Sequence, residues 1–265
     1  MPPIVLKDPD YQEGFMEKFF DVCLEIANSE LDDTLDDQIL TISGIAVFQA
    51  SFLVSYFKSA GLDNAVELLP SVLPAVVHIA RLSSMNCLTY AVKSFNYLTI
   101  LISSSQSGND EVTNPTEELI DLFIEKLTES SRYEFSILSD IIKAIAEIIR
   151  CCGIDILKRK ELDLIGILSS VLTQTMNPYT GALFVPADIL DPISNLFIGI
   201  AFSTRGNTDE ILEAIIPMLT DLLDHNSYQY QVFSIKTFAE LISRSSTMSS
   251  MPDELKIELM QTMLK

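Results

Sequence analysis

The chain has 265 residues, 48% of them hydrophobic, which is enough to build a continuous core and is not the composition of a disordered protein. Its 17 Lys and Arg residues against 37 Asp and Glu residues give a formal net charge of −20 and a pI of about 4.3. Nonspecific nucleic-acid binding is disfavoured, because contacts to phosphates need a basic surface.

Apolar residues recur at helical spacing along the whole chain, and short clusters of Ser, Asn, Gly and Pro separate the segments. An all-α fold is therefore expected. Acidic residues beside a capping residue or a proline mark three helix starts, at Asn114–Glu118, Thr208–Glu210 and Pro252–Glu254. In chain order, we predict helices over residues 10–28, 35–58, 63–82, 86–104, 116–129, 134–152, 160–175, 187–203, 208–224, 228–246 and 252–264.

The second of these helices contains 20 residues without a charge, Gln38 to Phe57, which is the length that spans a bilayer. Basic anchoring residues are nearly absent, because Asp36 and Asp37 flank one end and Lys58 the other. We therefore expect a buried helix. The alternative is a membrane- or lipid-associated helical domain, which the positive mean hydropathy of +0.29 also favours.

The N-terminus has no basic segment followed by an apolar run, so no signal peptide is expected. The four cysteines, two of them adjacent at Cys151 and Cys152, match neither a disulfide framework nor a metal-binding spacing. Core thiols in a reducing compartment are the better interpretation. We accordingly expect a cytoplasmic or nuclear location.

Two kinds of helix recur in the same order along the chain. The first-helix stretch Leu68–Val72 aligns with Leu119–Phe123, Leu164–Leu168 and Ile215–Leu219, at offsets of 51, 45 and 51 residues. The second-helix stretch Lys93–Leu98 aligns with Lys143–Ile148, Ser194–Gly199 and Lys236–Leu241, at offsets of 50, 51 and 42 residues. Helix pairs at this period are typical of an α-solenoid, because one pair buries its apolar face only when the next pair stacks on it.

The segment IIPMLTDLLDHNSYQYQVFSIKTFAELI, from Ile215 to Ile242, resembles a HEAT repeat. It has a proline in its first helix, a short polar turn, and a basic residue ahead of small and apolar positions in its second helix. Pro70 aligns with Pro217, where first helices of HEAT repeats commonly bend. Either Pro70 bends its helix and Pro74 is a second break, or Pro70 lies at the first helical position and Pro74 alone is internal.

The resemblance to HEAT and armadillo proteins implies a right-handed α-solenoid of about five antiparallel helix pairs. Such proteins include nuclear transport receptors, phosphatase scaffolds, chromosome-organising subunits and assembly chaperones, and the acidic bias of this chain is similar to that of the transport receptors and assembly chaperones that have basic cargo. The loop Met176–Pro186 breaks the local period. We expect one domain over 1–265, with an N-terminal arm at 1–9, a first pair at 10–60, HEAT-like pairs at 63–105, 115–152, 160–203 and 208–247, and a terminal helix at 252–265.

Residues for catalysis are scarce. Of the two histidines, His78 lies in an apolar run and His225 in a polar turn, and no nucleotide-binding, metal-binding or nucleophile motif is present. We therefore predict no enzymatic activity, no metal and no cofactor. A helical enzyme whose site is assembled from scattered residues is the third class of function, after a protein-binding scaffold and a membrane-associated domain.

The expected function is a scaffold or adaptor that presents an acidic surface to a Lys- or Arg-rich protein segment or to a subunit of a larger assembly. One candidate surface is the acidic segment Glu30, Asp32, Asp33, Asp36 and Asp37, which reads either as a solvated loop that caps the next helix or as a patch for a basic partner. The unpaired terminal helix is a candidate for oligomerisation. The turns offer exposed aromatic candidates at Tyr179, Tyr228 and Tyr230, with Tyr11 and Tyr133, whereas we place Phe48, Phe52 and Phe95 in the core.

Overall fold

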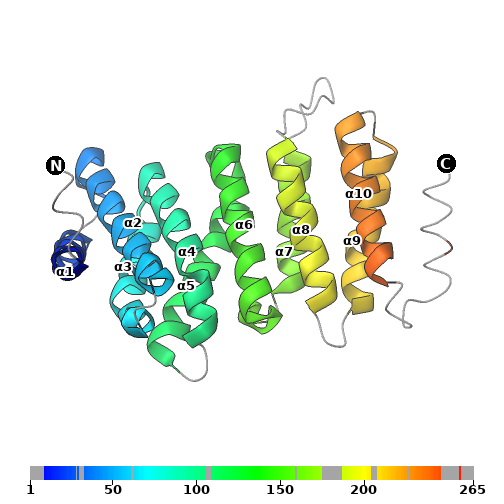
Figure 1. The fold of residues 1–265 in the computed structure, drawn as a ribbon. Coiled ribbons are helices and arrows are strands. Elements are labelled where there is room, and N and C mark those ends of the chain that lie inside the picture. Colours follow the sequence, from blue (N-terminus) through cyan, green and yellow to red (C-terminus); the bar gives the residue numbers. More distant parts are fainter. Residues whose placement is uncertain are drawn as a thin grey trace. The chain divides into compact units, whose positions relative to one another are not determined.

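The structure is a computed structural model, and it describes residues 9–27, 29, 33–60, 63–105, 109–158, 160–174, 187–203, 208–225, 227–245 and 257. These residues form helices and turns and contain no strand, which confirms the predicted all-α class (Figure 1). The chain divides inside its fifth helix into two compact units, Met1–Phe123 and Ile124–Lys265. The single domain over 1–265 stays a prediction.

Ten α-helices and three short 3₁₀ helices are found in the described ranges. The first unit contains α1 (Pro9–Ala27), α2 (Asp37–Ser59), the 3₁₀ helix η2 (Asp63–Leu68), α3 (Leu69–Arg81), α4 (Met85–Ser105) and most of α5 (Asp110–Thr128). The second contains η3 (Ser130–Arg132), α6 (Phe135–Cys152), η4 (Ile154–Leu157), α7 (Glu161–Gln174), α8 (Ala187–Ser203), α9 (Thr208–Leu223) and α10 (Tyr228–Ser245).

Most of the predicted helix boundaries lie within a few residues of the boundaries of these ten helices. The predicted terminal helix 252–264 lies outside the described residues except for Ile257, and the loop Met176–Pro186 lies outside them entirely.

In the first unit, α2 is the central helix. It packs against α1, α3 and, most extensively, α4, while α3 also packs against α4 (Figure 1). The side of α2 that faces its neighbours is rich in small residues, among them Ser43, Gly44 and Ala50, and these allow a close helix approach. The buried hydroxyl of Ser51 donates to the carbonyl of Val47 at 2.9 Å, so this polar group is satisfied inside α2.

The two prolines of the third helix occupy different positions. Pro70 lies in the first turn of α3, where a missing backbone N–H breaks no helical hydrogen bond, and Pro74 lies inside the helix. The preceding residues Asp63–Leu68 form a 3₁₀ helix. The structure therefore agrees with the second of the two alternatives, in which only Pro74 is internal.

The fifth helix begins earlier than the predicted start beside Asn114. Asn109 accepts a hydrogen bond from the backbone N–H of Glu111 through its side chain, at 3.1 Å, so α5 starts at Asp110 and Pro115 lies inside it. An ion pair joins Glu118 of α5 to Arg81 of α3. Phe123 of α5 packs edge-to-face on Phe95 of α4, with ring centroids 5.5 Å apart.

In the second unit, α8 packs against both α6 and α10, and α9 packs against α7, α8 and α10. The hydroxyl groups of Thr237 in α10 and Ser194 in α8 are hydrogen-bonded to each other at 2.7 Å. Ser194 is half-buried, whereas Lys93, Lys143 and Lys236, the residues aligned with it, are exposed.

The alignment at Ser194 is therefore displaced. The exposed-buried-buried pattern of the three lysine stretches begins three residues earlier in α8, at Asp191. The carboxylate of Asp191 lies 4.0 Å from the ammonium group of Lys236. The third stretch thus has an acid where the other three have a lysine.

Candidate protein-binding surface

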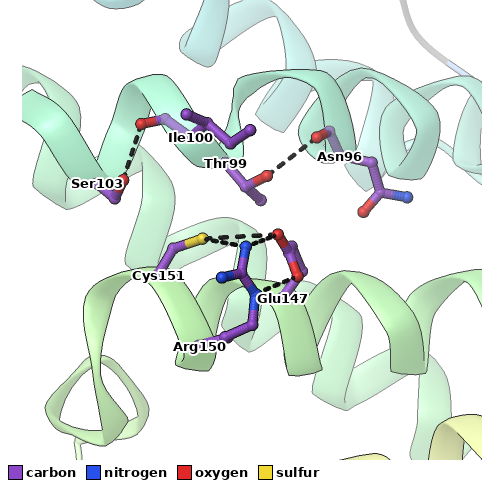
Figure 2. Close-up of polar contacts among 7 residues, drawn as sticks. All are labelled: Asn96, Thr99, Ile100, Ser103, Glu147, Arg150 and Cys151. Carbon is purple, nitrogen blue, oxygen red and sulfur yellow. Dashed lines mark hydrogen bonds and ion pairs between the residues drawn. The ribbon is translucent and has the colours of Figure 1, made fainter.

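The C-terminal half of α6 holds a compact polar cluster of Glu147, Arg150 and Cys151 (Figure 2). The Arg150 guanidinium donates to both carboxylate oxygens of Glu147, from Nε at 2.8 Å and from Nη2 at 2.5 Å. The Cys151 thiol donates to Glu147 Oε1 at 3.6 Å, and Arg150 Nη2 lies 3.4 Å from the Cys151 sulfur. Thr99 and Ser103, also drawn in Figure 2, bond to carbonyls of their own helix, α4.

The chemistry of this cluster does not favour nucleophilic catalysis. Burial and the negative charge of Glu147 raise the pKa of the Cys151 thiol, and Arg150 opposes this only in part. Burial and the neighbouring Cys151 raise the pKa of Cys152 to about 11. Both thiols therefore stay protonated near neutral pH, and the thiolate is the reactive form.

The surroundings of the two histidines are those of residues that stabilise the fold. His225 accepts a hydrogen bond from the backbone N–H of Ser227 at Nδ1, at 3.1 Å, and its carbonyl accepts one from Gln231 at 2.9 Å. These bonds fix the turn between α9 and α10. His78 is half-buried within α3. In the part of the chain that the structure describes, no three His, Cys, Asp or Glu side chains are placed to hold a metal ion.

Three of the five acidic candidates bond to residues at or near helix starts. Asp33 accepts hydrogen bonds from the backbone N–H and the hydroxyl of Ser83, at 2.7 and 3.0 Å. Asp37 accepts one from Ser84 at 2.7 Å, and Asp36 caps α2 by accepting from the backbone N–H of Gln38 at 2.8 Å. Glu30 and Asp32 lie outside the described residues.

These bonds agree with the capping interpretation of the segment. All three carboxylates remain exposed. Because the donors are neutral, the negative charge at this end of α2 and α4 is not cancelled by them.

The aromatic candidates at the turns have different surroundings. Tyr228 is 77% exposed, as expected. The expectation that Tyr230 is exposed is wrong: its ring is completely buried, and its hydroxyl donates to the carbonyl of Leu172 at 2.5 Å. Tyr133 is half-buried, and Tyr179 lies outside the described residues.

Phe52, which the sequence places in the core, is 41% exposed and belongs to an apolar surface that sequence analysis missed. Phe95 is buried as predicted, and Phe48 is half-buried. The surface lies along α2 and α4, which pack side by side in the first unit (Figure 1). Its members, here called the α2–α4 apolar face, are Ile42, Ile45, Phe48, Phe52, Tyr56, Tyr90, Tyr97 and Ile100.

Aromatic contacts across the two helices organise this face. The Phe52 and Tyr97 rings are perpendicular, at 89°, with centroids 5.5 Å apart. Phe48 contacts both Tyr90 and Tyr97, at centroid distances of 6.0 and 5.6 Å. The ammonium group of Lys93 lies 6.0 Å from the Tyr90 ring centroid. Such contacts restrain the rings, so the face is largely preformed.

The same face contributes to the apolar character of α2. By length and composition, α2 is the one helix in the described part of the chain that could cross a membrane, and half of its apolar window is buried inside the structure. The buried side packs against α1, α3 and α4. The other side carries Ile42, Ile45, Phe52 and Tyr56, which are between 38% and 57% exposed.

No protein-family model, curated protein or solved structure matches this chain. Fold and surface together define an all-α protein of packed helices that exposes a preformed aromatic and aliphatic face.

Proposed function

We propose that this protein is a non-enzymatic scaffold or adaptor of the α-solenoid class that holds a protein partner on the α2–α4 apolar face. The observation that carries the proposal is a set of eight aromatic and aliphatic side chains along one pair of helices, six of them exposed and two, Phe48 and Tyr90, half-buried. Contiguous apolar surfaces of this kind mark interaction sites, whereas single exposed apolar residues are ordinary. Rigid aromatic side chains supply much of the binding energy in protein interfaces.

The helix packing within each unit supports the solenoid class. Alternate helices lie side by side, α2 with α4 in the first unit and α6 with α8, α8 with α10 and α7 with α9 in the second. The contacts Asp37 to Ser84 and Phe52 to Tyr97 show that α2 and α4 run in the same direction. Parallel second helices from successive pairs are what a solenoid repeat produces.

The burial of residues at equivalent repeat positions also supports the solenoid class. Phe95, Ile145 and Phe238 occupy the same position in three of the aligned second-helix stretches, and all three are completely buried. The number of about five pairs, the right-handed sense and the membership of the HEAT class rest on the sequence resemblance.

A protein partner is favoured over a lipid surface. The first unit, residues 1–123, contains 5 Lys and Arg residues against 18 Asp and Glu residues, a net charge of −13. Such a charge repels the anionic cytoplasmic leaflet and attracts basic protein segments. The predicted cytoplasmic or nuclear location is compatible with either ligand.

The test is affinity capture from an extract of the source cells with three immobilised forms of the chain: the wild type, Phe52→Ser and the control Ile235→Ser. Ile235 lies on α10 and is 46% exposed, so the control removes a similar exposed apolar group from the second unit. We expect a protein that the wild type and the control retain equally and that Phe52→Ser loses by about tenfold or more. Circular dichroism checks that both variants fold.

Equal retention by all three forms would contradict the proposal. Binding of the wild type to neutral phosphatidylcholine vesicles that is lost in Phe52→Ser would also contradict it, in favour of the membrane-associated alternative. The capture is repeated at about 0.1 M and about 0.5 M salt, because high salt weakens binding through exposed charges and leaves binding through buried apolar contacts largely unchanged.

A further inference from the structure

We propose that the occupant of the α2–α4 apolar face is one amphipathic helix of a partner protein, with an apolar stripe of about four turns and with Lys or Arg residues concentrated at one end. The basic end lies over Asp33, Asp36 and Asp37. This inference rests on the proposed function and adds the conformation, the length and the charge pattern of the partner segment.

The conformation follows from what α2 and α4 offer. The backbone N–H and C=O groups of a helix interior are already paired, so the face has no strand edge to which an extended peptide could add. An extended segment would cover the apolar side chains with its own backbone groups unpaired. A helix pairs its backbone internally and presents side chains alone, and a third helix packs readily along two parallel helices.

The length follows from the extent of the apolar residues along α2. Ile42 and Tyr56 are the two ends of this stripe, and all of its members lie on one side of α2. At a rise of 1.5 Å per residue the stripe is about 21 Å long, which corresponds to about four turns of a partner helix. On α4, Tyr90, Tyr97 and Ile100 run beside it over about 15 Å.

The polarity follows from the charges at the two ends. At the end where α2 and α4 begin, the described charged residues of these helices and their entry turns are Asp33, Asp36 and Asp37, all exposed. The positive ends of the helix dipoles offset part of this charge. The other end of α2 carries Lys58, and Lys93 stands in the middle beside Tyr90. A partner helix with positive charge at one end therefore has one favoured direction.

The test uses two fluorescent helical peptides of about 15 residues, each with a Leu and Phe stripe on an Ala background. One carries three Lys residues at its N-terminal end, and the other carries Glu at the same positions. Fluorescence anisotropy with the full chain measures binding. We expect the Lys peptide to bind about tenfold more tightly than the Glu peptide, because its positive charges are attracted to the acidic end of the face and the negative charges of the Glu peptide are repelled by it.

Two charge variants locate the effect. In Asp33→Asn with Asp37→Asn, the amide oxygens keep acceptors for Ser83 and Ser84 while two charges are lost. We expect this variant to bind the Lys peptide about threefold to tenfold more weakly, and Phe52→Ser to lose binding of both peptides. The control, Asp155→Asn with Asp163→Asn, makes the same charge change at exposed positions of the second unit and leaves the preference intact.

Several outcomes overturn this inference. Equal affinity for the Lys and Glu peptides, or equal effects of the two double variants, removes the charge argument. Failure of both peptides to bind, while capture of a cellular protein still depends on Phe52, leaves the proposed function standing and rejects the helical ligand. Sedimentation that shows self-association lost in Phe52→Ser identifies a second copy of the chain as the occupant instead.

Discussion

Gly44 of α2 and Tyr90 of α4 are in such close contact that a Cβ added at Gly44 would lie 2.9 Å from Cδ2 of the tyrosine ring. The ring also contacts Phe48, so it has little room to move away. The absence of a side chain at Gly44 therefore sets the distance at which α2 and α4 pack and the position of the aromatic residues on the exposed face.

The first prediction is that Gly44→Val destabilises the first unit by about 1–3 kcal/mol, although glycine is itself a poor helix former, because the added side chain overpacks the contact with Tyr90. Urea unfolding followed by circular dichroism measures the loss. Gly166→Ala is the control, because nothing lies within 4 Å of a Cβ at Gly166, and it should stabilise α7 by up to about 1 kcal/mol. Wild-type stability of Gly44→Val would show that the helices are not in this contact.

The second prediction concerns the start of α2. Asp36→Ala should lower the free energy of unfolding by about 1 kcal/mol, because the backbone N–H of Gln38 loses its acceptor. Asp36→Asn keeps an acceptor and should stay close to the wild type in the same unfolding experiment. If the Asn and Ala variants were equally destabilised, the negative charge rather than the cap hydrogen bond would be responsible.

The third prediction concerns the buried hydroxyl of Tyr230. It donates to the carbonyl of Leu172 in the last turn of α7, so Tyr230→Phe should cost about 1 kcal/mol while the packing of the ring is kept. Tyr228→Phe changes an exposed ring two residues away and should have no measurable effect. Equal thermal stabilities of the two variants would exclude the hydrogen bond to α7.

The fourth prediction concerns the thiol of Cys151. Because its pKa is raised, by burial first and by Glu147 second, its thiolate forms only above the pH at which an ordinary cysteine ionises. Glu147→Gln removes the negative neighbour and leaves Arg150, so it should lower the pKa and speed alkylation by iodoacetamide at any pH below the pKa. The rate against pH is measured in a Cys152→Ser background.

Slower alkylation in Glu147→Gln than in the parent would contradict this account of the cluster. Cys23 and Cys87 are buried and serve as internal references that react slowly in both proteins.

The helices could be predicted from the sequence because apolar spacing of 3.6 residues is a local signal, and ten of the eleven predicted helices correspond to observed ones. The first residue of a helix was harder to predict where two nearby residues could each cap it, as at the start of α5. Asn109 and Asn114 both precede acidic residues, and the structure uses the first. Proline at position 115 marked a start in the sequence but lies inside the helix.

The binding surface could not be predicted because exposure depends on neighbours that are distant in sequence. Tyr228 and Tyr230 have the same local setting, yet only Tyr230 reaches the end of α7. Phe52 lies in an apolar stretch in which both sides of the helix have the composition of a buried core. Only the packing of α4 against α2 shows which side of α2 stays exposed. The bonds from Asp33 to Ser83, 50 residues away, leave no local signal either.

The central claim, that the α2–α4 apolar face holds a protein partner, is tested most directly by photo-crosslinking in the source cells. A benzoylphenylalanine replaces Phe52 in one strain and Tyr228 in another, since both positions are exposed and lie in different units. We predict a protease-sensitive adduct of higher mass from position 52 and none of that mass from position 228. The same adducts from both positions, or no protein adduct from position 52, would contradict the claim.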